Sequence, residues 1–155
     1  MQLEIRIAEA RDLDSIIDLF RECVLTVCRA DYSTEQLAAW ASSSENIERW
    51  RGKIKDQFFI VAIDNGTIVG FGSLQESATV DLLYVHKHFQ GIGVARALLH
   101  ELTTMARQSG AMELKADVSK TARGFFENSG FRVVAKKSNK RNGVVLDNFE
   151  MIRAL

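Results

Sequence analysis

The chain has 155 residues, 46% of them apolar and 26% charged, which is the composition of one globular domain that can bury a core. Its 20 basic residues balance its 20 acidic residues, so the net charge does not favour attraction to nucleic acid. No apolar run approaches the length of a membrane span, and the first residues do not resemble a signal peptide. We therefore expect a single domain over residues 1–155, cytoplasmic, with no nucleic-acid or membrane partner.

The first part of the chain is predicted to form a strand and then helices. Three apolar residues alternate with polar ones, as in a strand with one buried face: Leu3, Ile5 and Ile7. Apolar residues at helical spacing indicate a helix over residues 13–27. Ser33 followed by Gln36 resembles a capping box that begins a second helix, and Asn46 can cap a third.

Strands and helices then alternate through the rest of the chain. A buried strand over residues 58–63 precedes Asn65-Gly66, a strong two-residue hairpin signal. The further expected elements are strands over residues 67–74, 80–86, 112–118, 131–135 and 144–152, a helix over residues 94–107 and a short helix after Ser119. This order predicts an α/β or α+β domain with a mixed central sheet covered on both faces.

A turn with two glycines joins the strand over residues 80–86 to the helix that follows it. The first N–H groups of a helix have no partner within the helix, and glycine allows close approach, so this turn predicts an anion site. A P-loop would need Lys followed by Ser or Thr after Gly93, and a dinucleotide fold would need a third glycine. The chain has Val94-Ala95-Arg96 instead, which leaves a different kind of phosphate site.

The turn reads Gln90-Gly91-Ile92-Gly93-Val94-Ala95 and resembles the acetyl-CoA signature of the GNAT superfamily of N-acetyltransferases, Gln/Arg-x-x-Gly-x-Gly/Ala. The stretch T-A-R-G-F-F-E-N-S-G-F over residues 121–131 is similar to a second GNAT signature, and the element order matches as well. Residues 32–41 are similar to a bacterial subgroup of uncharacterised members. The resemblance implies a GNAT-like fold, with a splayed mixed sheet of about seven strands flanked by helices on both faces.

The resemblance also implies an activity and its cosubstrate. It implies transfer of an acetyl group from acetyl-CoA to a primary amine of a small molecule or protein by direct attack on the thioester. The backbone of the turn would hold the pyrophosphate, and the Val85 amide would polarise the thioester carbonyl. The residues implied in cofactor binding are Leu83, Tyr84, Val85, Gln90, Gly91, Ile92, Gly93, Val94, Ala95, Arg96, Ser119, Phe125 and Phe126. Ser119 could instead cap the helix that follows it.

The candidate catalytic residues match the GNAT pattern less fully than the cofactor turn does. Strand alternation places Asp81 on the face of Leu83 and Val85, near the acetyl group, which makes it the candidate base. The alternative is an aspartate at a bulge or in a salt bridge to a neighbouring strand. Many relatives carry a proton-donating Tyr where this chain has Phe126, so Tyr32 and Tyr84 become the candidate acids, with Tyr84 expected on the face opposite Asp81.

The remaining expectations concern metals, partners and a rival function. His86 and His88 are joined by no cysteine or carboxylate cluster, so we expect no metal site. The sequence allows a monomer or a homodimer and does not identify the acceptor amine. The missing Tyr leaves a second interpretation open, a non-catalytic acyl-CoA-binding or sensor module with the same fold.

Overall fold

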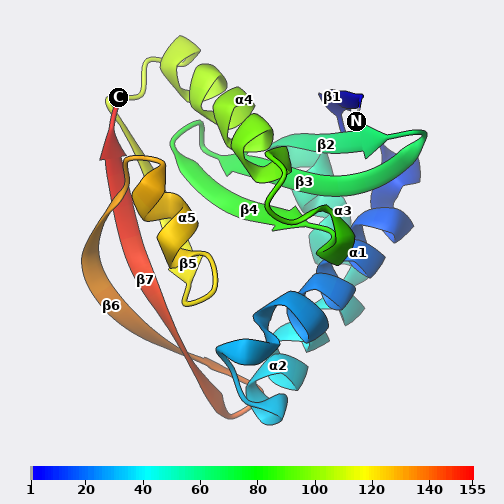
Figure 1. The fold of residues 1–155 in the computed structure, drawn as a ribbon, viewed down its shortest axis with the longest axis vertical. Coiled ribbons are helices and arrows are strands. Elements are labelled where there is room, and N and C mark those ends of the chain that lie inside the picture. The colour runs from blue at the N-terminus through cyan, green and yellow to red at the C-terminus, as the bar shows by residue number, and fades with distance from the viewer. Residues whose placement is uncertain (1) are drawn as a thin grey trace.

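The computed structural model describes residues 2–155 and has one seven-stranded sheet with helices on both faces (Figure 1). The strands are β1 Leu3–Ile7, β2 Phe58–Asp64, β3 Thr67–Gln75, β4 Thr79–Val85, β5 Glu113–Ser119, β6 Arg132–Arg141 and β7 Val144–Ala154. The α-helices are α1 Leu13–Thr26, α2 Thr34–Ala41, α3 Ile47–Asp56, α4 Val94–Gln108 and α5 Arg123–Asn128. Four short 3-10 helices connect them: η1 Ala10–Asp12, η2 Val27–Ala30, η3 Ser42–Glu45 and η4 Lys87–Phe89.

The sheet is splayed between β4 and β5. Its strand order is β1-β2-β3-β4-β5-β7-β6, and every neighbouring pair is antiparallel except β4 with β5. These two parallel strands have seven residues each, yet they pair only at Thr79 with Lys115 and at Val80 with Ala116. Beyond Val80 the two halves of the sheet diverge (Figure 1). The predicted mixed, splayed sheet of about seven strands is confirmed.

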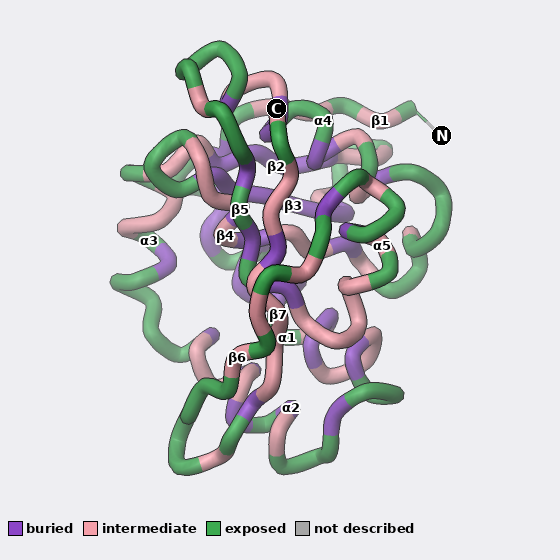
Figure 2. Tube along the Cα trace, turned by 90° about the vertical axis from the view of Figure 1, so that its left-hand side faces the viewer, coloured by how far each residue is buried: buried purple, intermediate pink, exposed green. Residues whose placement is uncertain are grey.

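Two hydrophobic cores cover the two faces of the sheet. The first lies between the sheet and α1, α2 and α3, with Phe20, Trp50 and Phe71 among its buried members. The second lies beneath α4 and α5 and includes Leu98 and Phe126. Figure 2 shows the buried segments gathered in the central strands, with the exposed ones in turns and outer helix faces. The helices therefore hold the splay open from both sides.

A register shift in β4 overturns one prediction. Val80 and Leu82 pair with consecutive residues of β3, so Asp81 is the extra residue of a bulge between them. Val80, Leu83 and Val85 consequently pack toward α4, whereas the Asp81 side chain bonds to α3. The predicted common face of Asp81, Leu83 and Val85 is wrong, because the bulge reverses the alternation at Asp81.

The same shift changes the position of Tyr84 relative to Asp81. Tyr84 packs in the first core, against Phe20 at 5.1 Å between ring centroids, on the α1–α3 side where Asp81 also points. The expectation that the two lie on opposite faces is therefore also wrong. In β1, Ile7 is 62% exposed rather than buried, because the chain turns there and Ala8 enters the core instead.

Helix α4 lies very close to β3. A Cβ atom built on Gly70 would meet Val94 Cγ1 at 3.0 Å and Leu98 Cδ1 at 3.1 Å. Glycine at this position thus lets the first turn of α4 rest directly on the strand. This contact fixes the glycine turn beside the end of β4, which is where the splay opens.

Candidate active site

A cavity of about 910 Å³ occupies the splay between β4 and β5. It extends from the glycine turn and the start of α4, along β4, to the segment between α1 and α3 and the β6–β7 hairpin. Every site residue predicted from the sequence lines it: Tyr32, Asp81, Leu83, Tyr84, Val85, Gln90, Gly91, Ile92, Gly93, Val94, Ala95, Arg96, Ser119, Phe125 and Phe126. The fold therefore brings three distant parts of the chain to one site: Tyr32, residues 81–96 and residues 119–126.

The glycine turn leaves the start of α4 open to an anion. Gly91 and Gly93 have φ angles of 71° and 97°, in the left-handed region that a side chain would strain. Gly93 is the N-cap, and no side chain of residues 2–155 accepts from the first N–H groups of the helix. The first turn has no acidic residue, and Arg96 adds an exposed positive charge there. These features fit a phosphate group.

The edge of β4 offers backbone amides to the same cavity. The amide of His86 donates to the Val69 carbonyl at 2.8 Å and so points toward β3. Successive amides of a strand point to opposite sides, so those of Leu83 and Val85 point toward the splay. Because β5 pairs with β4 only as far as Val80, these N–H groups are available to an extended ligand.

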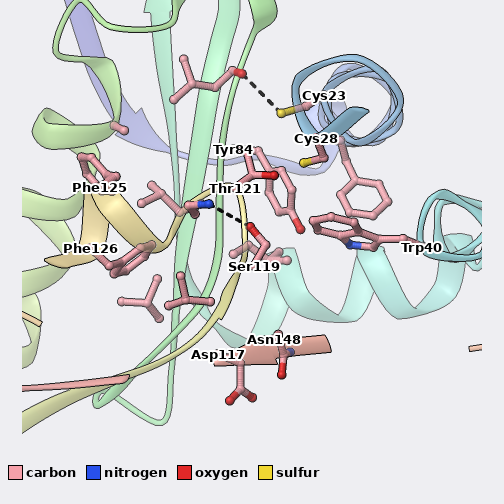
Figure 3. A pocket seen from close by; sticks show the side chains of 18 of the residues that line it. Cys23, Cys28, Trp40, Tyr84, Asp117, Ser119, Thr121, Phe125, Phe126 and Asn148 are labelled. Carbon is pink, nitrogen blue, oxygen red and sulfur yellow. Dashed lines mark hydrogen bonds between the residues drawn. The ribbon is translucent and has the colours of Figure 1, made fainter. Parts of the chain in front are cut away.

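A side-chain contact that the sequence did not predict joins the turn to this strand. The Gln90 side chain donates from Nε2 to the Val85 carbonyl oxygen at 2.6 Å. The Cys23 thiol lies 3.5 Å from the same oxygen, as Figure 3 shows. Gln90 thus holds the glycine turn beside the strand, and its backbone rather than its side chain faces the anion site.

Tyr32 is tied to two other segments. Its hydroxyl donates to the Asp147 carbonyl at 3.0 Å and accepts from the Lys120 amide at 2.9 Å. Burial raises the pKa of this hydroxyl. The Tyr32 proton is therefore engaged in a bridge that joins the η2–α2 connection to β7 and to the β5–α5 loop.

Tyr84 points into the cavity from β4, toward Trp40 (Figure 3). Burial raises the pKa of its hydroxyl strongly, so the group stays protonated. Tyr84 is thus a hydrogen-bond donor at the centre of the site, although it binds its proton more tightly than a free tyrosine does.

The loop between β5 and α5 forms the opposite wall. The Ser119 hydroxyl accepts from the Ala122 amide at 3.1 Å, so it caps the turn that leads into α5 (Figure 3). Phe125 and Phe126 lie edge to face with centroids 5.5 Å apart. Phe126 is buried and also packs on Phe131, so this position supplies an apolar wall and no proton.

Asp81 lies where the cavity meets α3. Its Oδ2 atom accepts from Lys53 Nζ at 2.5 Å and from Gln57 Nε2 at 2.9 Å. Both contacts use the same oxygen, and Oδ1 accepts no hydrogen bond from residues 2–155. Lys53 and Gln57 were not expected at the site. The structure has the alternative raised from the sequence, an aspartate at a bulge, and its salt bridge is to α3 rather than to a neighbouring strand.

The two cysteines of the cavity are unreactive thiols. Burial raises the pKa of Cys23 to about 12 and also raises the pKa of Cys28. A thiol that stays protonated is a poor nucleophile, so the cavity does not favour an acyl-cysteine intermediate. Among residues 2–155 there is no cluster of three metal-ligating side chains, and no helix is long and apolar enough to cross a membrane.

Comparison with known proteins identifies the family. The model of the acetyltransferase (GNAT) domain matches residues 28–153. The uncharacterised N-acetyltransferase YafP of Escherichia coli strain K12 is 34% identical over 149 residues, which are 96% of this chain and 94% of YafP. The chain therefore belongs to the GNAT family of N-acetyltransferases, as the two sequence signatures indicated.

Solved structures show the same fold. A GCN5-related N-acetyltransferase from Rhodopseudomonas palustris superposes with a TM-score of 0.97 and 29% identity, covering 100% of this chain and 97% of that one. The PaiA N-acetyltransferase of Thermoplasma acidophilum, solved with coenzyme A, has a TM-score of 0.82 and 21% identity, covering 100% of both chains. The overall fold is thus common to these proteins.

Proposed function

We propose that this protein is an acetyl-CoA-dependent N-acetyltransferase that acts on a primary amine of a small molecule or protein. The observation that carries the proposal is the splay beyond Val80, where free strand-edge amides and an open helix N-terminus share one cavity. An extended acyl chain attached to a pyrophosphate matches both features. Membership of the family supports the same activity.

The residues present fit acetyl-CoA. The backbone from Gln90 to Ala95 would hold the pyrophosphate, with Arg96 beside it. The amides of Leu83 and Val85 would hold the extended arm, and Phe125 and Phe126 would cover its apolar side. The Val85 amide would donate to the thioester carbonyl, where negative charge develops during attack.

When bound, acetyl-CoA supplies an activated acetyl group: the amine nitrogen forms the new C–N bond, the C–S bond breaks and the thiolate leaves. The protein must accept a proton from the amine, whose ordinary pKa is about 10.4. Asp81 is the proposed acceptor, through its free Oδ1 atom, while Lys53 and Gln57 hold Oδ2 in place. The bulge gives this carboxylate access to the cavity from the α3 side.

Tyr84 is the proposed donor to the departing sulfur. Its hydroxyl points into the cavity, whereas the Tyr32 hydroxyl already donates to Asp147. Since the pKa of Tyr84 is raised by burial, complete proton transfer to a thiolate with a pKa of about 8.5 is uphill. We therefore assign Tyr84 a hydrogen bond to the thiolate rather than full protonation.

A thiol-release assay tests this proposal. Purified protein is incubated with acetyl-CoA and a panel of amines, and free CoA is measured across pH 6 to 10. We expect amine-dependent release that Asp81→Asn lowers about 100-fold and that Tyr84→Phe lowers about 10-fold. Wild-type turnover in Asp81→Asn at every pH would contradict the base assignment.

The alternative is a non-catalytic acyl-CoA sensor, which the apolar Phe126 favours. Calorimetric titration with acetyl-CoA, together with the thiol-release assay, distinguishes the two functions, because a sensor binds acetyl-CoA without turning it over. Tight binding with no release on any amine would establish the sensor. Release with any amine would exclude it.

A further inference from the structure

Two arginines line the cavity where it meets η3 and the β6–β7 hairpin: Arg49 of α3 and Arg141 of β6. The residue that follows each arginine bonds to the same short segment, η3. The Trp50 indole donates to a carbonyl of η3 at 3.0 Å, and the Asn142 amide donates to a hydroxyl of η3 at 2.9 Å. Figure 1 shows this hairpin tip beside α2, away from α4. The arginines therefore lie at the end of the cavity away from the glycine turn. We call this the acceptor end, because the glycine turn at the other end is the proposed cofactor site.

Neither arginine has an acidic partner within residues 2–155, and this distinguishes them from the other charges of the acceptor end. Each carboxylate that lines the cavity has a lysine partner, at 2.5, 3.2 and 3.9 Å: Asp81 with Lys53, Asp117 with Lys137, and Asp147 with Lys136. Asp117 also points away from the cavity in Figure 3. The charge left without a partner at this end is therefore positive.

The wall between the arginines and β4 is aromatic. Trp40 and Tyr84 lie with ring centroids 6.4 Å apart, and Phe20 packs edge-on against Tyr84. Arg141 and Tyr84 line the same cavity; burial raises the pKa of the Tyr84 hydroxyl, and the positive charge of Arg141 opposes part of that rise. An acceptor that reaches from the arginines to β4 would thus pass an apolar wall.

We propose that the acceptor is a small amine that also carries a carboxylate, and that Arg49 and Arg141 bind this carboxylate while the amine lies beside Asp81. The inference rests on the proposed function and narrows its substrate class. A guanidinium donates two parallel hydrogen bonds to a carboxylate, which fixes the orientation of the ligand. A polyamine has the opposite charge and would meet the unpaired arginines unfavourably.

Matched acceptor pairs test the inference. The panel consists of β-alanine, 4-aminobutyrate and L-phenylalanine, the carboxamide of each, and spermidine. We expect kcat/KM for each acid to exceed that of its carboxamide at least 10-fold. Arg49→Gln and Arg141→Gln should each lower kcat/KM for the acids about 10-fold and leave the carboxamides within twofold.

Two control variants remove a neighbouring charge that does not line the cavity. Arg51 lies on α3 and pairs with Glu48, and Lys140 precedes Arg141 in β6. Neither residue lines the cavity. Arg51→Gln and Lys140→Gln should therefore keep the preference for acids, and loss of the preference in these variants would show a general charge effect and overturn the inference.

A binding measurement separates this inference from the acetyltransferase proposal. Calorimetric titration of each acid is performed on the CoA-loaded protein and on CoA-loaded Arg141→Gln. Binding that requires Arg141, without turnover, would keep the carboxylate site and overturn acetyl transfer. Turnover of carboxamides or spermidine equal to or above that of the acids would keep acetyl transfer and overturn the carboxylate site. If no acid is bound and no acid is turned over, the carboxylate site is overturned as well.

Discussion

The Gln90 side chain donates to the carbonyl oxygen of Val85 at 2.6 Å, and this bond joins the glycine turn to the strand edge. The two halves of the proposed cofactor site lie on different elements, and this bond adds to the packing of α4 on β3 in holding the turn beside the strand end. The Gln90 side chain, by bonding to the Val85 carbonyl, sets the distance between two parts of the proposed cofactor site. These are the glycine turn, proposed to hold the pyrophosphate, and the Val85 amide, proposed to polarise the thioester.

Removal of this donor should weaken both cofactor binding and turnover. We expect Gln90→Ala to raise the KM for acetyl-CoA about 5-fold and to lower kcat, since a hydrogen bond of this kind contributes about 1 kcal/mol. Steady-state kinetics measure both parameters. The control is His100→Ala, an exposed substitution on α4 outside the cavity. Unchanged constants in Gln90→Ala would show that the turn is held in place without this bond.

Arg96 should act on the phosphates alone. We expect Arg96→Gln to raise the Kd for acetyl-CoA about 3-fold to 10-fold at low salt, with a smaller difference at 0.5 M salt because ions screen an exposed charge. Arg107→Gln is the matched control, since Arg107 lies in the last turn of the same helix. Calorimetry at two salt concentrations measures the effect. Equal affinities for Arg96→Gln and Arg107→Gln would remove Arg96 from the site.

Gly70 and Gly52 should respond in opposite ways to alanine. A Cβ on Gly70 would lie 3.0 Å from Val94 and 3.2 Å from the Tyr84 carbonyl, so Gly70→Ala should destabilise the fold by about 1–3 kcal/mol. Gly52 lies inside α3 with nothing within 4 Å of such a Cβ, so Gly52→Ala should stabilise the fold by about 0.5–1 kcal/mol. Urea unfolding measures both, and a neutral Gly70→Ala would contradict the close packing of α4 on β3.

The parts of the site that follow from local chemistry were predictable from the sequence. The hairpin at Asn65-Gly66 and the left-handed glycines of the turn are features of a few adjacent residues, and the structure has both. The bulge at Asp81 could be named from the sequence only as an alternative, because it depends on the register between two strands rather than on the residue itself. Arg141 was missed for a related reason. It is distant in sequence from the other site residues, and it reaches the cavity only because β7 pairs with β5 and β6 pairs with β7.

Tyr32 offers a test that separates a structural role from an acidic one. Its hydroxyl satisfies the Lys120 amide and the Asp147 carbonyl, so Tyr32→Phe leaves two polar groups without this partner. We expect a loss of about 1–3 kcal/mol in the free energy of unfolding, with kcat changed less than 3-fold at a temperature where the variant is folded. A loss of kcat above 100-fold with unchanged stability would instead identify Tyr32 as the acid.

Asp12 should make the fold sensitive to acid. Its buried carboxylate accepts from both terminal nitrogens of Arg6, at 2.7 and 3.0 Å, and from the Glu9 amide at 2.7 Å, which joins β1 to the start of α1. The hydrogen bond from Arg6 is the main cause that lowers the pKa of Asp12, and burial opposes it. Since the folded state holds this group ionised, its stabilising effect is present above the ordinary pKa of about 3.9 and is lost as the pH falls through the lowered value.

The free energy of unfolding should therefore decrease below about pH 4, and Asp12→Asn should remove the Asp12 contribution to that decrease. At pH 7 this variant should be less stable by about 1.5–3 kcal/mol, because the charge-assisted bonds to Arg6 are lost. Asp14→Asn is the control, since Asp14 is an exposed aspartate only two residues further on, at the start of α1. Urea unfolding between pH 2.5 and 7 measures the three proteins. Parallel profiles for wild type and Asp12→Asn over this range would show that the ion pair does not couple the fold to pH.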